Sequence, residues 1–281
     1  MYTAPNDSHP YIPYQQWPEY RLENDPPDFF KPESFTQDGI IGIRWRLGIL
    51  RFEESVSDRE PRVGKHPYGR IVFWQRIYRR DIPKGWHQGF FAKSPHKIGY
   101  AQIKQTEYWK AWPETTRYYR RKWLKECLDK KYSIEKVELE AYKEAYLQSS
   151  VVKKVGLRQI EKLERKMNLA SKNINLWGVR RLSDHKIVAG LGVINSQTFA
   201  SSNHFSAFMH EEVKGDRISL GLVDHWFKDS LVNNIKLLDF GIFWQKGDPS
   251  SWKGFSEFKG QFDITFISLP PRLFKIVFKQ G

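Results

Sequence analysis

Residues 175–209 read NLWGVRRLSDHKIVAGLGVINSQTFASSNHFSAFM, and this stretch decides the fold. It contains three runs rich in Val, Ile, Leu and aromatic residues, at 175–182, 186–195 and 202–209, a composition typical of β-strands. The first two runs meet at the polar turn SDHK, which is too short for a crossover and therefore implies antiparallel neighbours. The sequence predicts three consecutive antiparallel strands.

Further elements are predicted on both sides of these strands. The patterns before them indicate a strand and two amphipathic helices: YSIEKVEL (132–139), EAYKEAYLQSS (140–150) and GLRQIEKLERKM (156–167). The patterns after them indicate a helix, a buried strand, a short helix or turn, and two closing strands: 219–233, 236–243, 257–262, 263–269 and 273–278. Residues 131–281 are therefore predicted to form one α+β subdomain.

The part before residue 131 has a different pattern. Residues 1–38 contain seven Pro together with many Tyr, and we expect an arm held down by its aromatic side chains, Tyr11, Tyr14, Trp17 and Tyr20, with a disordered tail as the alternative. GIIGIRWRLGIL (39–50) alternates in polarity as one half-buried strand does, and a polar loop follows at 54–69. A second strand is predicted at 69–82 and a short third strand at 87–95. The predicted organisation is an arm, 1–38, a first subdomain, 39–130, and a second subdomain, 131–281.

Composition restricts the functional classes. The chain has 281 residues, 40% of them hydrophobic, which is enough for a folded core. Its single cysteine, Cys127, excludes an intramolecular disulfide and a cysteine-built zinc site, and no metal site is expected from the scattered histidines. No run of 18 apolar residues is present, so we expect a cytoplasmic protein, free or at the inner face of the membrane. The usual hydrolase, metalloprotease and nucleotide-binding motifs are missing.

The net charge of +14 favours an anionic partner. Residues 104–172 contain 18 Lys and Arg against 10 Asp and Glu, so this helical block carries +8 of it. Five of its cations lie close together on one predicted helix: Arg117, Arg120, Arg121, Lys122 and Lys125. With Tyr118, Tyr119 and Trp123 beside them, they are suited to the phosphates and unpaired bases of RNA, although a solvated helix face gives the same pattern.

Three stretches resemble the FemABX peptidoglycan aminoacyltransferases, a branch of the GNAT-like acyltransferase superfamily. They are QRIYRRDIPKGWHQGFFAKSP (75–95), LLDFG (237–241) and WKGFSEFKGQF (252–262). The resemblance implies an α+β fold with tandem GNAT-like subdomains, each a mixed, mostly antiparallel sheet flanked by helices. Asp263 stands where the family usually has Gly after Phe262.

The resemblance also implies an activity. Such enzymes transfer an amino acid from aminoacyl-tRNA to an amine on a cell-wall precursor, without a covalent enzyme intermediate. Lys259 would then be the catalytic residue, stabilising negative charge on the oxyanion or the leaving oxygen. The alternative is that Lys259 pairs with Glu257 or Asp263 at a surface turn.

Substrate-binding residues follow from the same stretches, each with a structural alternative. Asp239 either faces the site or caps a neighbouring backbone, and Gly241 is expected to adopt a conformation that other residues avoid. Trp252, Phe255 and Phe258 either line an acceptor cleft or pack a core.

Coenzyme A is not favoured as a cofactor, because VKGDRISLG (213–221) lacks the glycine-rich turn with which GNAT enzymes bind its pyrophosphate. We expect aminoacyl-tRNA as donor, a cell-wall precursor or another amine as acceptor, and peripheral contact with an anionic membrane. Two alternatives stay open: a GNAT-type N-acyltransferase acting on another small amine, and a non-catalytic protein that binds RNA or anionic lipid.

Overall fold

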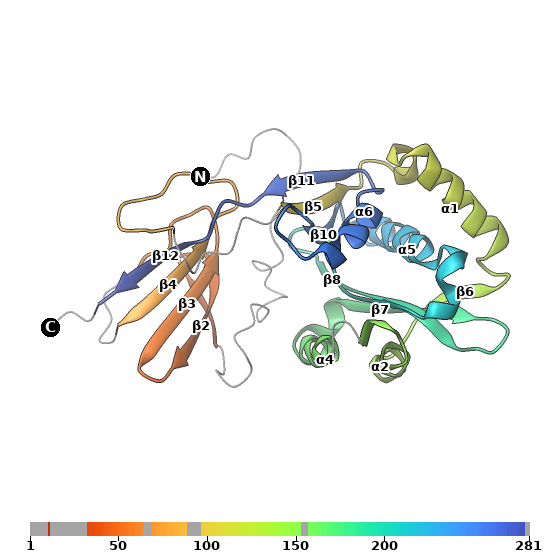
Figure 1. Cartoon of the computed structure of the whole chain (residues 1–281), viewed down its shortest axis with the longest axis horizontal. Coiled ribbons are helices and arrows are strands. Elements are labelled where there is room, and N and C mark those ends of the chain that lie inside the picture. Colours follow the sequence, from red (N-terminus) through yellow and green to blue (C-terminus); the bar gives the residue numbers. More distant parts are fainter. Residues whose placement is uncertain (1–10, 12–32, 64–68, 89–96, 153–156, 279–281) are drawn as a thin grey trace. The chain divides into compact units, whose positions relative to one another are not determined.

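The computed structural model describes Tyr11 and residues 33–63, 69–88, 97–152 and 157–278. Their strands form two mixed sheets, which confirms the predicted α+β class (Figure 1). The predicted third strand of the first subdomain, within 87–95, and most of the N-terminal arm lie outside the described residues. Of the four aromatic residues expected to hold that arm down, only Tyr11 lies within the described residues, and it is buried.

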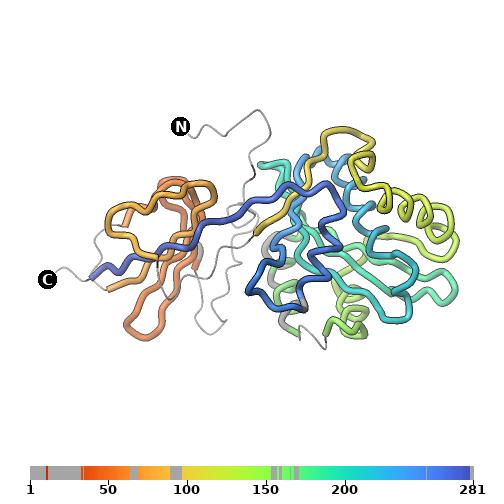
Figure 2. The backbone as a smooth tube through the Cα atoms, turned by 45° about the horizontal axis from the view of Figure 1, so that its top comes forward, coloured from red at the N-terminus to blue at the C-terminus, as the bar shows by residue number. Residues whose placement is uncertain are grey.

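The first sheet has five strands in the order β1-β2-β3-β4-β12. Their bounds are β1 (Glu33–Gln37), β2 (Ile40–Leu47), β3 (Leu50–Val56), β4 (Arg70–Gln75) and β12 (Leu273–Val277). One face of this sheet carries a compact core in which Trp74 and Trp86 pack edge to face against Val72 and Leu273. Figure 2 shows the blue C-terminal strand beside the orange strands.

Two sequence expectations for this region are wrong. Residues 39–50 do not form one strand, because Gly48 and Ile49 make a two-residue turn between β2 and β3. Gly48 has φ +59°, and glycine at the first position of such a turn is the usual solution for a tight hairpin. The strand at 273–277, expected to close the second subdomain, pairs instead with β4 of the first sheet.

The second sheet has seven strands in the order β11-β5-β10-β9-β8-β7-β6. Their bounds are β5 (Lys97–Gln102), β6 (Tyr132–Lys136), β7 (Ile174–Arg181), β8 (Ile187–Ser196), β9 (Ser201–Met209), β10 (Leu237–Phe243) and β11 (Ile264–Ser268). Strands β7, β8 and β9 are the predicted antiparallel strands, within one residue of their expected bounds.

All described α-helices accompany this second sheet. They are α1 (Glu114–Glu126), α2 (Leu139–Leu147), α4 (Arg158–Ala170), α5 (Ile218–Val232) and α6 (Lys253–Lys259). Helices α2 and α4 cover one face, α5 covers the other, and α1 packs on α5 (Figure 1). The contact of α1 with α5 needs Gly221, since a Cβ there would lie 2.2 Å from the Trp123 ring.

The chain divides into two compact units that do not follow the predicted boundaries. One unit contains Gly99–Gly241 and Lys253–Thr265, so it takes in helix α1, which the sequence assigned to the first subdomain. The other contains the described residues of Tyr11–Ile98, Ile242–Trp252 and Phe266–Gly281. Each unit is built from several separate stretches of sequence, because the chain passes from one unit to the other several times.

Candidate active site

Strands β9 and β10 run parallel but pair only briefly. Their register covers three positions and ends at Asp239 opposite Asn203. Beyond this point Gly241 takes φ +67°, and its N–H donates a 2.7 Å hydrogen bond to Oδ1 of Asp239. The predicted special conformation of Gly241 is confirmed, and the carboxylate of Asp239 caps the backbone at the point where the pairing of the two strands ends.

Lys259 reaches the main chain at this same point. It is the last residue of α6, only 5% exposed, and its Nζ donates a 2.5 Å hydrogen bond to the carbonyl of Phe240. The ammonium also lies 4.3 Å from the centre of the Phe255 ring. Since the side chain is buried, the alternative of a lysine at a surface turn is wrong.

Burial also changes the protonation of Lys259. Desolvation lowers its pKa to about 7, against the opposing effect of the Asp239 carboxylate, which favours the charged form. An amine with such a pKa exists in both protonation states near neutral pH. It can therefore donate a hydrogen bond to developing negative charge or exchange a proton with a reacting group.

His204, on β9, was not predicted as a site residue. Its Nδ1 lies 3.3 Å from the carbonyl oxygen of Asp239, which can only accept, so Nδ1 carries the proton and Nε2 is left as an acceptor. Burial, and secondarily the charge of Lys259, lower the pKa of His204 to about 3, so the imidazole is neutral. No local sequence pattern indicates this role, because the residues that surround His204 lie on distant segments, Trp226, Phe240 and Phe255.

The three aromatic residues predicted to bind substrate have different surroundings. Phe255 is half-exposed and contacts both Lys259 and His204. Phe258 packs edge to face on the buried Phe262, which agrees with the alternative that Phe258 packs a core. Trp252 is exposed and belongs to the other unit. Of the three, the structure brings only Phe255 to Lys259.

The predicted cationic face of α1 is partly neutralised. Arg120 donates from Nε to Oδ1 of Asp224, and both side chains are largely buried. The prediction that Arg120 is available to bind phosphate is therefore wrong. Arg117 and Arg121 both pair with Glu114, and Lys122 lies 3.8 Å from Glu126. Lys125 is exposed. Helical spacing places these residues together but does not reveal the carboxylates that face them.

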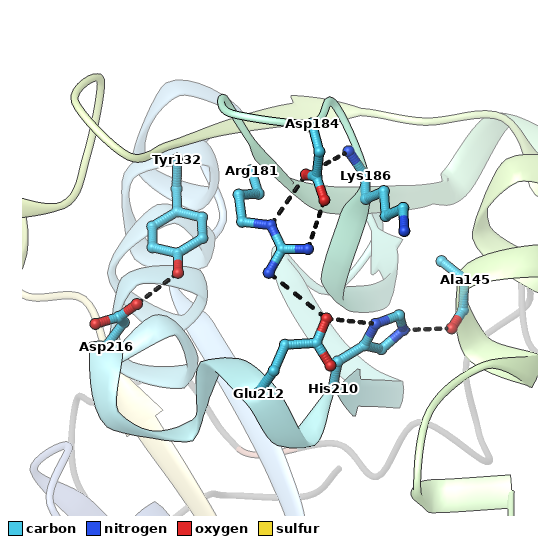
Figure 3. Close-up of polar contacts among 8 residues, drawn as sticks. All are labelled: Tyr132, Ala145, Arg181, Asp184, Lys186, His210, Glu212 and Asp216. Atoms are coloured by element: carbon cyan, nitrogen blue, oxygen red, sulfur yellow. Dashed lines mark hydrogen bonds and ion pairs between the residues drawn. The ribbon is translucent and has the colours of Figure 1, made fainter.

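Polar side chains contact the short 3-10 helix η6 (Glu211–Asp216), which lies directly before α5 in the sequence (Figure 3). Glu212 lies 3.6 Å from Arg181 and 3.9 Å from the ring of His210, and Asp216 accepts a hydrogen bond from the Tyr132 hydroxyl. Asp184 accepts hydrogen bonds from Nε and Nη2 of Arg181, which lowers the pKa of Asp184 to about 2. The segment before α5 is therefore fixed by polar contacts among the chain's own residues.

Within the described residues, no group of three or more His, Cys, Asp or Glu is arranged to hold a metal ion. None of the described helices is both long and apolar enough to cross a bilayer.

Comparison with known proteins reveals similarity of structure alone. No protein-family profile matches the chain, and no curated protein is detectably similar in sequence. The structure of FemX aligns with a TM-score of 0.61 at 10% identity, over 88% of this chain and 87% of that one. L-PGS from Bacillus licheniformis aligns with a TM-score of 0.52 at 9% identity, over 87% and 84% of the two chains.

A third solved structure is the C-terminal domain of a putative lysylphosphatidylglycerol synthetase from Agrobacterium fabrum. It aligns with a TM-score of 0.51 at 11% identity, over 89% of this chain and 84% of that one. The resemblance to FemABX proteins drawn from the three sequence stretches is thus confirmed at the level of the fold. The chain has a fold similar to that of FemX and of lysylphosphatidylglycerol synthetase domains, over most of its length.

Proposed function

We propose that this protein is an acyltransferase that moves an amino acid from aminoacyl-tRNA to an amine, on a cell-wall precursor or a related acceptor. The observation that carries the proposal is the buried Lys259 beside the ends of the paired segments of β9 and β10. The similarity in fold to FemX and to a lysylphosphatidylglycerol synthetase domain supports it.

The chemistry of aminoacyl transfer matches the properties of Lys259. The acceptor nitrogen attacks the ester carbonyl, negative charge develops on the carbonyl oxygen, and the C–O bond to the tRNA ribose then breaks. The departing ribose oxygen needs a proton, and the nitrogen must lose one. A lysine with a pKa of about 7 can stabilise the oxyanion as an ammonium and can return to this form after giving up a proton.

His204 would serve as an orienting group. Because its Nδ1–H is held by the carbonyl of Asp239, its Nε2 can accept a hydrogen bond from an amine N–H. With a pKa of about 3 it is a weak base, so we assign it the positioning of the acceptor and leave proton transfer to Lys259.

Two features favour tRNA over coenzyme A as the source of the acyl group. A helix N-terminus binds a pyrophosphate through its free N–H groups, but the segment leading into α5, VKGDRISLG (213–221), lacks a glycine-rich turn, and its Asp216 accepts a hydrogen bond from Tyr132. The block 104–172 with its net charge of +8 contains exposed cations on α1, among them Arg121 and Lys125. These are suited to the backbone of a nucleic acid.

The test is a transfer assay with the full chain. A pool of labelled aminoacyl-tRNAs is mixed with cell-wall precursors bearing a free amine, and parallel reactions contain labelled acetyl-CoA. We expect label to move from tRNA to the precursor, and Lys259→Met to lower the rate by at least about a hundredfold. Lys253→Met is the matched control, since Lys253 is an exposed lysine on the same helix.

Other outcomes would reject the proposal. Label moving only from acetyl-CoA would identify an N-acetyltransferase. Transfer that Lys259→Met leaves unchanged would remove Lys259 from the mechanism. Binding of tRNA without any product, from all donors, would identify a non-catalytic RNA-binding protein.

A further inference from the structure

One end of the five-stranded sheet has an unusual surface. The β2–β3 hairpin ends in the turn Gly48–Ile49, and Ile49 is 88% exposed. Leu47 and Leu50, the last pair of the hairpin, are exposed as well. An apolar side chain is not required here, because a two-residue turn with glycine first accepts Ser or Asn at its second position.

The strand register brings a fourth apolar residue to this end. Arg51 of β3 lies beside Arg70 of β4, and Arg70 lies opposite Val277 of β12. Phe278 follows Val277 and is 77% exposed. Figure 1 shows the β2–β3 turn, the start of β4 and the end of β12 at the same end of the sheet. We call Leu47, Ile49, Leu50 and Phe278 the apolar edge.

A row of cations lies directly behind the apolar edge. Arg46, Arg51 and Arg70 occupy successive positions across three neighbouring strands, with Arg46 opposite Arg51 in the hairpin. Arg70 is buried and paired with Glu53, whereas Arg46 is exposed. Since a strand rises about 3.4 Å per residue, the cations stand one such step behind the apolar side chains.

Aromatic side chains continue the pattern one residue further from the edge. Trp45 and Phe52 are opposite each other in the hairpin, half-buried, with ring centres 5.5 Å apart. From the tip inward, the hairpin therefore presents aliphatic, cationic and aromatic side chains, with the arginines on the opposite face of the sheet from the other two kinds, because side chains alternate along a strand. In a membrane interface aliphatic groups enter the acyl region, arginines bind lipid phosphates, and Trp lies at headgroup level.

We propose that the apolar edge inserts into the surface of an anionic lipid bilayer, with the exposed Arg46 at the level of the lipid phosphates. The net charge of +14 adds attraction to such a surface. This inference goes beyond the proposed function and does not depend on it, because it concerns residues of the five-stranded sheet and not Lys259.

The first experiment measures co-sedimentation of the full chain with two kinds of vesicles. One contains phosphatidylcholine alone, and the other contains phosphatidylcholine and phosphatidylglycerol. We expect the chain to bind the anionic vesicles, and we expect Ile49→Ser to weaken this binding about tenfold. The reason is that the variant no longer transfers the aliphatic side chain of residue 49 from water into the bilayer. The serine suits the turn, so the fold is expected to be retained.

Val232→Ser is the matched control. Val232 is 81% exposed at the end of α5, in the other unit, and its replacement should leave vesicle binding unchanged. Arg46→Gln should weaken binding at low salt and reduce its salt dependence.

The second experiment places a fluorescent probe at the edge. The chain has one cysteine, Cys127, which is buried, so Ile49→Cys can be labelled selectively with an environment-sensitive dye. Insertion predicts a blue shift on addition of anionic vesicles, and no shift for label at Val232→Cys. The proposal is overturned if the chain does not bind anionic vesicles, or binds them without a shift at position 49. It is also overturned if Ile49→Ser prevents self-association of the protein and leaves its binding to anionic vesicles unchanged.

Discussion

Arg120 and Asp224 form a buried ion pair between two helices. The side chain of Arg120 is 11% exposed and that of Asp224 is 2% exposed, and the 2.5 Å contact joins positions 104 residues apart. Tyr108 donates to the same oxygen of Asp224, and Lys228 lies 2.9 Å from the other oxygen. The carboxylate thus holds α1, α5 and the segment before α1 together.

The first prediction concerns this ion pair. We expect Arg120→Ala to lower the free energy of unfolding by about 3 kcal/mol, because it removes a partner from a buried carboxylate. Arg121→Ala, in the same helix but exposed, should cost no more than about 1 kcal/mol. Urea unfolding of both variants measures the difference, and equal midpoints would show that the pair contributes nothing.

The second prediction concerns RNA binding by the exposed cations of α1. The triple change Arg121→Gln, Lys122→Gln, Lys125→Gln should weaken tRNA binding and lower the slope of log K against log salt by about 2. Arg120 is left intact so that stability does not confuse the result. Changing Lys172, Lys186 and Lys236 to Gln removes the same charge from other exposed positions and serves as control. An unaltered slope in the α1 variant would identify these cations as solvated surface.

The third prediction follows from the lowered pKa of Lys259. Below about pH 7 the amine is protonated in both the folded and the unfolded chain. Between about 7 and its ordinary value of 10.5 the folded chain has released a proton that the unfolded chain keeps, so the free energy of unfolding rises with pH. Lys259→Met should lack this contribution. Denaturant titrations from pH 6 to 9.5 compare the two proteins, and parallel pH profiles would contradict a lowered pKa.

The fourth prediction tests the backbone where β9 and β10 stop pairing. Gly241 has φ +67° and no atom near the position of a Cβ, so Gly241→Ala should cost about 1–2 kcal/mol from the left-handed conformation alone. Gly254 in α6 has equally open surroundings and no positive φ, and Gly254→Ala should be neutral or stabilising. Thermal melting of both variants measures the contrast. Similar effects of both substitutions would show that the φ of Gly241 is not the cause.

Short-range patterns predicted much of the second sheet and its helices. The amphipathic pattern of EAYKEAYLQSS (140–150) predicted a helix with one buried face, and Tyr142, Ala145 and Tyr146 of this helix are buried. The turn at Gly48 was missed because alternating polarity continues through it and a single glycine fits a strand as well. The site was predicted only in part, since the surroundings of Arg120 and His204 depend on residues distant in sequence, Asp224 and Phe255.

The pairing of β12 with β4 has a consequence for synthesis of the protein. Leu273 of β12 is fully buried against Trp74 and Trp86. The core of the five-stranded sheet is therefore incomplete until residues 273–277 have left the ribosome. During translation, apolar surface of β1 to β4 stays exposed while almost two hundred further residues are synthesised. Nascent chains arrested before β12 should therefore be sensitive to proteases in residues 33–75 and should be bound there by chaperones.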